Sequence, residues 1–159
     1  MAIDDWNWRL RVTPQDYPWD CAAASTAWAM TACGHPATEQ EVIAGMGRHR
    51  ITPTWGLMDA SGAGIVEYLA EVGITALNDA EASFQEVMDA AGYQPMVIGG
   101  REWNHWVGVR MGSAAAGRPE LGLLALANTA PGYMGVEQLL NQDNFARLGP
   151  FSAVWFTDW

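Results

Sequence analysis

The chain has 159 residues, of which half are hydrophobic and 16% are charged, and its formal net charge is -10. This length and apolar content predict one globular domain over residues 1–159, which buries roughly two thirds of its unfolded surface, and they exclude a disordered protein. Because only eight Lys and Arg oppose 18 Asp and Glu, the composition argues against nucleic acids and anionic membranes as partners.

The N-terminal sequence MAIDDWNWRL lacks the basic start and apolar core of a signal peptide, and no later segment has the ~20 apolar residues of a membrane span. We therefore expect a cytoplasmic protein, or one exported by other means. Cys21 and Cys33 would lie about 18 Å apart on one continuous helix, so they are expected to be free thiols. The nine tryptophans are expected to fill the core or to line an aromatic cleft.

Helical patterns dominate the first half of the chain. Asp20 is expected to cap an apolar, and therefore central, helix over residues 21–33. Three more helices are expected from their caps and stop signals: residues 38–46, opened by Thr38 and Glu41, residues 59–71, ended by Gly73, and residues 79–92, capped by Asp79. Residues 47–57 are expected to form a loop, and ITAL (residues 74–77) a short strand.

The second half of the chain is richer in strand patterns. Strands are expected at PMVIGG, HWVGVRMG and LGLLALAN, which are residues 95–100, 105–112 and 121–128. A helix is expected over residues 135–149 and a last strand over residues 151–158. Helices that precede a mainly antiparallel sheet, instead of alternating with its strands, predict an α+β fold.

Cys21 is the first candidate for a chemical role, because it stands where the apolar helix begins. The free N–H groups and partial positive charge of a helix N-terminus favour a thiolate over a thiol, as a nucleophile requires. Taken alone, however, a cysteine in an alanine-rich helix is more often a small buried apolar residue.

Three other residues could complete such a site. His105 begins a strand, where it could act as a base or be purely structural. Asn128 ends a strand, and its amide could accept the second ring N–H of His105 and fix the tautomer, or could only begin a turn. Gln15 could donate to an oxyanion beside the Cys21 N–H, an effect of about 3 kcal/mol, or could be an ordinary surface residue.

The order and local settings of these residues resemble the papain-like cysteine peptidases, most closely the bacteriocin-processing, double-glycine peptidase-like branch. The segments QDYPWDC (15–21), NHWV (104–107) and NTAPG (128–132) carry the match, which covers residues 13–157. The resemblance implies a papain-like fold, a peptide or protein substrate, no cofactor, and four roles: Cys21 as nucleophile, His105 as base and acid, Asn128 as the residue that orients the imidazole, and Gln15 as oxyanion donor.

The chain also departs from the pattern of that branch. Ala22 replaces the glycine that often follows the nucleophile, the expected proline is displaced to Pro131, and Asn128 stands where Asp is common. These differences leave the subfamily open.

Other functions stay open as well. The acyl-enzyme could cleave other amides or transfer its acyl group, or the fold could be an inactive peptide-binding module. A metal site of Cys21, Cys33 and His35 lacks the four closely spaced ligands of structural zinc. His35 and His49 lie in loop-like segments where no function is expected. The acidic chain would favour neutral or basic peptides on encounter.

Overall fold

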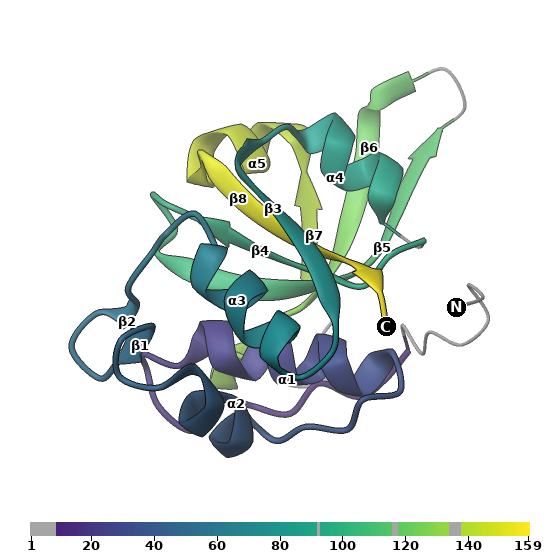
Figure 1. Ribbon diagram of the computed structural model, residues 1–159. Helices are drawn as coiled ribbons and strands as arrows, with labels where there is room; N and C mark the ends of the chain where they lie inside the picture. The colour runs from purple at the N-terminus through teal and green to yellow at the C-terminus, as the bar shows by residue number, and fades with distance from the viewer. Residues whose placement is uncertain (1–8, 92, 116–117, 134–137) are drawn as a thin grey trace.

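The computed structural model describes residues 9–91, 93–115, 118–133 and 138–159. Within these ranges the centre is a six-stranded antiparallel sheet with the strand order β3-β8-β4-β5-β6-β7 (Figure 1). Its strands are β3 (Thr75–Ala82), β4 (Met96–Gly100), β5 (His105–Ala115), β6 (Arg118–Ala127), β7 (Gln138–Asn141) and β8 (Phe151–Asp158). The α+β architecture predicted from the sequence is therefore confirmed.

Helices lie on both sides of this sheet (Figure 1). The first side has α1 (Cys21–Ala32), α2 (Glu39–Met46) and α3 (Ala63–Glu71), and the second has α4 (Phe84–Ala90) and α5 (Gln142–Leu148). Two short strands, β1 (Ile51–Thr52) and β2 (Gly56–Leu57), form a hairpin beside the first layer, and Pro131–Tyr133 form a short 3-10 helix. None of the helices in the described ranges combines the length and the apolar character needed to cross a bilayer.

Side-chain alternation along the strands builds one core on each side of the sheet. Val97 and Trp106 point to the core that contains α1, whereas their neighbours Ile98 and Val107 point to the core that contains α4 and α5. A β-bulge interrupts the pairing of β5 with β6 between Val109 and Met111.

The central helix α1 is buried along its whole length except at Thr31, as its apolar sequence predicts. It packs closely on β5, because Gly108 has no side chain: a Cβ atom there would lie 2.4 Å from the Trp28 ring. The sheet therefore holds α1, and with it the start of the helix, in a defined position.

The predicted helix cap at Asp79 is wrong. Asp79 lies within β3 and pairs with Ala153 of β8, so this strand is longer than the expected residues 74–77. The next helix begins after Ser83, which forms a capping box with Glu86. Asp79 and Ser83 are both suitable helix caps by residue type. Pairing with β8 holds the backbone of Asp79 in an extended conformation, so the helix begins after Ser83, where the capping box satisfies the first free N–H groups of the helix.

The helix predicted over residues 135–149 is also wrong in part. Gln138–Asn141 form β7, paired with β6, and α5 begins only after Asn141, whose side chain accepts the Asn144 N–H. Residues 135–137 lie outside the described residues. Elsewhere the differences are small: α3 begins at Ala63, and the loop predicted over residues 47–57 contains β1 and β2.

Candidate active site

The pairing of β5 with β6 brings His105 and Asn128 together. The strands are antiparallel, with Gly108 opposite Ala127, so the start of β5 lies beside the end of β6. His105 Nε2 lies 2.7 Å from Asn128 Oδ1. An amide oxygen only accepts hydrogen bonds, so the imidazole donates from Nε2, and Nδ1 is the unprotonated nitrogen of the neutral ring.

The buried amide of Asn128 is held in this orientation from two directions. Its Oδ1 also accepts the Ala130 N–H at 2.9 Å, and its Nδ2 donates to Gln138 Oε1. Sequence reasoning did not identify Gln138, because this residue falls in the segment that was expected to be helical. Gln138 lies on β7, the strand that pairs with β6, and this brings its side chain to the amide of Asn128.

Cys21 is the first residue of α1 and is 8% exposed. Its Sγ accepts a hydrogen bond from the backbone N–H of Trp106 at 3.4 Å, which brings the start of α1 to the start of β5. Cys21 and His105 both line a cleft with a volume of about 640 Å³. The thiol and the imidazole therefore face a common space large enough for part of a peptide.

Two walls enclose this cleft. We call residues 99–106, from the end of β4 to the start of β5, the strand wall, and residues 53–60, around β2, the hairpin wall. Trp19, Trp55 and Trp106 line the cleft. Trp103 packs edge to face on the imidazole of His105, with 5.1 Å between ring centroids. The cleft is therefore strongly aromatic, as the tryptophan content of the chain suggests.

Local backbone geometry supports the strand wall. Asn104, directly before His105, has a φ of 51°, a left-handed conformation that asparagine adopts more readily than most residues. Gly99 pairs with Trp106, and a Cβ atom at Gly99 would lie 2.4 Å from the indole. These two positions let the chain turn into β5 and let the Trp106 ring lie flat across β4.

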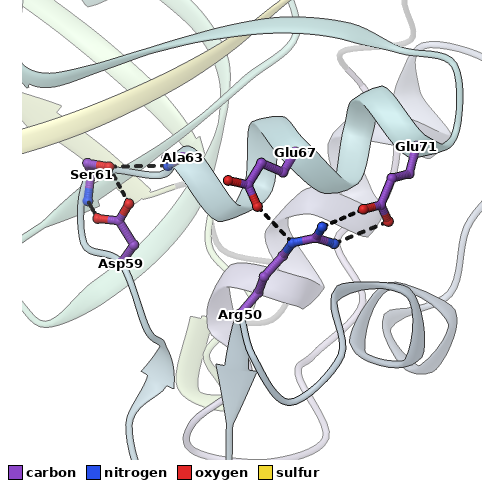
Figure 2. Close-up of polar contacts among 6 residues, drawn as sticks. All are labelled: Arg50, Asp59, Ser61, Ala63, Glu67 and Glu71. Carbon is purple, nitrogen blue, oxygen red and sulfur yellow. Dashed lines mark hydrogen bonds and ion pairs between the residues drawn. The ribbon is translucent and has the colours of Figure 1, made fainter.

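The hairpin wall is held by side-chain contacts on either side of it (Figure 2). Before it, Arg50 donates from Nε to Glu67 at 3.1 Å and from its two terminal nitrogens to Glu71, both carboxylates being on α3. At its end, Asp59 accepts the N–H and hydroxyl of Ser61 at 2.9 and 2.8 Å, and Ser61 Oγ accepts the Ala63 N–H.

Gln15 lies beside the end of β6 and is not among the residues that line the cleft. Its backbone N–H donates to Thr129 O at 2.8 Å, and its side-chain oxygen accepts the Thr129 hydroxyl at 3.1 Å. Its Nε2 donates to Tyr17 O at 2.7 Å. Because an amide has two N–H groups, one of them remains for another acceptor.

Asp20 does not act as the predicted side-chain cap of α1. Its fully buried carboxylate accepts the Tyr17 N–H at 3.1 to 3.2 Å, and no N–H of the helix reaches it. The carboxylate thus fixes the turn that precedes Cys21 instead of the helix that follows it.

Burial controls the protonation of the candidate pair. It raises the pKa of the Cys21 thiol, although hydrogen bonds from the N–H groups of Trp106 and Ala22 act in the opposite direction. It also lowers the pKa of His105 below its usual 6.5, an effect that the bond to Asn128 partly offsets. Both shifts favour the neutral forms, a thiol at Cys21 and an unprotonated imidazole at His105, whereas the helix N-terminus alone predicts a thiolate.

Cys33, near the other end of α1, has a different environment. It is a free, buried thiol that donates to Met30 O at 3.2 Å, and burial raises its pKa to about 12. Across the described part of the chain, no three His, Cys, Asp or Glu side chains cluster as a metal site would require.

The fold is similar to those of solved peptidase domains. The peptidase domain of Streptococcus ComA, a bifunctional ABC transporter involved in quorum sensing, is 18% identical, with a TM-score of 0.67 over 94% of this chain and 98% of that domain. A double-glycine-motif protease from an AMS/PCAT transporter, in complex with its leader peptide, is 16% identical, with a TM-score of 0.66 over 93% and 94%. The Streptococcus mutans ComA peptidase domain is 18% identical, with a TM-score of 0.58 over 93% and 99%.

The chain has the papain-like fold of these peptidase domains. No protein-family model matches the chain, and neither does any curated protein sequence. The papain-like fold predicted from three short segments is therefore confirmed by a similarity that covers 93–94% of the chain.

Proposed function

We propose that this protein is a cysteine peptidase, one domain over residues 1–159, with Cys21, His105 and Asn128 as its catalytic triad. The observation that supports this most strongly is the 2.7 Å contact of His105 Nε2 with Asn128 Oδ1, at the edge of a cleft that Cys21 also lines. The similar structure that holds a leader peptide supports a peptide as the class of substrate.

In the proposed reaction, His105 Nδ1 takes the thiol proton as Cys21 Sγ attacks the carbonyl carbon of the scissile bond. His105 then gives this proton to the leaving amine, and the acyl group remains on Cys21 as a thioester. Water, deprotonated by His105, attacks the thioester and releases the carboxylic acid, and the proton returns to the thiolate. Asn128 keeps the imidazole in one tautomer throughout.

The oxyanion is assigned to two donors, the backbone N–H of Cys21 and the remaining Nε2 N–H of Gln15. Gln15 is 8% exposed and is held by Thr129 and Tyr17. It would have to turn this N–H toward the cleft when substrate binds, because its side chain does not line the cleft in the free protein.

Cleavage of a pool of internally quenched fluorescent peptides tests the proposal. We expect wild-type protein to cleave some of them, and Cys21→Ala and His105→Ala to lose about 10³-fold or more in kcat. Cys33→Ala is the matched control, since it removes the other buried thiol and leaves the cleft intact. Full activity of Cys21→Ala would refute the assignment.

The pH profile gives a second test of the same pair. Because the His105 pKa is lowered, the neutral imidazole that serves as base persists below pH 6.5. We therefore expect the acidic limb of kcat/KM to lie below pH 6.5, and the alkaline limb to lie above the usual thiol pKa of 9.0, since the Cys21 pKa is raised.

A peptide-binding module without hydrolysis is the second candidate. The raised pKa of the Cys21 thiol favours it, because such a thiol is a weak nucleophile unless His105 accepts its proton. In that case iodoacetamide would alkylate Cys21 at the same rate in wild-type protein and in His105→Ala. In a peptidase the same substitution would slow the reaction. Transfer of the acyl group to an added amine or thiol would identify an acyltransferase.

A further inference from the structure

The cleft differs in charge from the protein as a whole. The chain carries a formal net charge of -10. Yet among the described residues that line the cleft there is no Asp, Glu or Lys, and Arg101 is the one side chain with a permanent charge. The other lining residues are glycine, apolar or aromatic side chains, and neutral polar groups such as Thr54 and Asn104.

Arg101 lines the cleft and makes two hydrogen bonds to backbone oxygens. Its backbone N–H donates to Pro150 O at 3.1 Å, and its Nη2 donates to Ala80 O, also at 3.1 Å. The Ser152 hydroxyl lies 3.2 Å from the same Ala80 oxygen and 2.6 Å from the oxygen of Ala60, a residue of the hairpin wall. The guanidinium is therefore held where the two walls approach each other.

Most of the hydrogen-bonding capacity of this guanidinium is open to a ligand. None of the ion pairs in the described ranges involves Arg101. Asp79 and Glu81 flank Ala80 in sequence, but neither carboxylate forms an ion pair with the guanidinium of Arg101. A guanidinium has five N–H donors in a planar arrangement that suits a carboxylate, and the bond to Ala80 occupies one of them.

We propose that Arg101 gives the cleft a preference for peptides with an acidic side chain close to the scissile bond. The inference rests on the proposed function, and it names the class of substrate for the same site. The carboxylate would accept hydrogen bonds from Arg101 while the scissile carbonyl lies against Cys21. Charge-assisted bonds of this kind are stronger than neutral ones.

The negative charge of the remaining protein does not contradict this preference. At an ionic strength of 0.1 M, charges more than about 10 Å apart are largely screened, whereas a direct contact in a cleft is screened much less. The acidic surface would slow the approach of an anionic peptide. Arg101 would favour that peptide once it is bound.

Matched peptides test the proposal. A cleaved peptide from the pool is prepared with Glu, Gln or Lys at each of the three positions on either side of the scissile bond. At one of these positions we expect wild-type protein to prefer Glu over Gln by about five- to tenfold in kcat/KM. Arg101→Gln should remove the preference, and Arg101→Glu should transfer it to Lys.

Arg147→Gln is the control for net charge. Arg147 is exposed on α5, where its Nη2 contacts Asn144, and it does not line the cleft. The Arg147→Gln variant changes the total charge by the same amount as Arg101→Gln and should retain the preference for Glu. Loss of the preference in both variants would assign it to the overall field and overturn the proposal.

Binding to Cys21→Ala separates this inference from the proposed function. The Glu, Gln and Lys forms of the peptides from the pool are compared by fluorescence anisotropy, with and without Arg101→Gln. Arg101-dependent selection of the Glu form without cleavage by wild-type protein would refute hydrolysis and uphold the inference. If wild-type protein cleaves the peptides, but its ratio of kcat/KM for the Glu and Gln forms equals that of Arg101→Gln, hydrolysis would be upheld and the inference refuted. If neither assay shows a preference for the Glu form that depends on Arg101, the inference is overturned.

Discussion

The two walls of the cleft are held in different ways. The strand wall belongs to the central sheet, where Gly99 and Gly100 pair with Trp106 and His105 through the backbone. The hairpin wall comes from a two-stranded hairpin outside that sheet, and the side chains of Arg50 and α3 fix it (Figure 2). The strand wall is thus held in place by main-chain pairing within the sheet. The hairpin wall is held against the rest of the protein by a few side-chain ion pairs and hydrogen bonds.

This difference indicates which wall suits a general base and which suits a residue that contacts the substrate. A general base must keep its orientation within narrow limits, so the strand wall suits His105. A wall that contacts the substrate can tolerate small movements, so the hairpin suits residues such as the 75% exposed Trp55. Substitutions in the two walls should therefore affect kcat and KM differently.

Among substitutions that weaken the support of a wall, the largest effect is expected at Gln138, which holds Asn128 against His105 of the strand wall. Gln138→Leu leaves the buried Nδ2 of Asn128 without its acceptor, which costs about 1–3 kcal/mol. The amide then loses its fixed orientation toward His105, and we expect kcat to fall about tenfold while KM changes little. Steady-state kinetics on a cleaved peptide would measure both.

Gln138→Glu is the matched variant, because its carboxylate still accepts from Asn128 Nδ2. It should retain most of the wild-type kcat at neutral pH. Equal losses in the two variants would show that Gln138 acts through the stability of β7 and has no role in orienting Asn128.

A smaller effect is expected from loosening the hairpin wall. Arg50→Ala removes the contacts with Glu67 and Glu71, and each carboxylate is more than half exposed, so each pair contributes about 1 kcal/mol at most. We expect KM to rise about threefold with kcat nearly unchanged, and faster amide hydrogen exchange in residues 51–58. A fall in kcat with unchanged KM would contradict the division of roles between the walls.

The smallest effect concerns the segment before Cys21, which is also held by side chains. Glu39 accepts the Asp16 N–H at 3.1 Å, and burial, together with neighbouring Asp20 and Asp16, raises its pKa from 4.5 to about 8. The folded protein therefore binds more protons than the unfolded chain between these values. Stability should therefore decrease as the pH rises from about 4.5 to about 8, and this contribution should be fully lost above the pKa of about 8.

Glu39→Gln isolates this contribution, because the amide cannot ionise and its oxygen still accepts the Asp16 N–H. We expect the melting temperature of wild-type protein to fall by a few degrees more than that of Glu39→Gln between pH 6 and pH 9. Parallel curves for the two proteins would show that Glu39 is already ionised at pH 6.

Local sequence patterns predicted the elements whose stability is mostly local or apolar. The buried faces of α1 and of the central strands are visible in the sequence, and so is the capping box of α2 at Thr38. Patterns failed where pairing between distant segments decides the structure. Asp79 is in a strand because of β8, and Gln138 is in a strand because of β6.

The candidate site shows the same division. Cys21, His105 and Asn128 were chosen from their positions at the ends of elements, and the antiparallel pairing of β5 with β6 brings the last two into contact. Arg50 contacts Glu67 and Glu71, which lie 17 and 21 residues away in sequence. Helix and strand periodicity cannot predict ion pairs between residues so far apart. The protonation of Cys21 could not be predicted either, because burial outweighs the helix N-terminus.

The β-bulge between Val109 and Met111 allows the two ends of the β5–β6 hairpin to vary independently. An extra residue is already accommodated there without disturbing the pairing of Gly108 with Ala127. Residues added beyond this point would displace only the remote end of the hairpin, whereas a one-residue slip before it would turn Asn128 to the opposite face of the sheet. The remote end is therefore the natural place to graft a recognition loop or a reporter sequence while the chemistry of the cleft is kept.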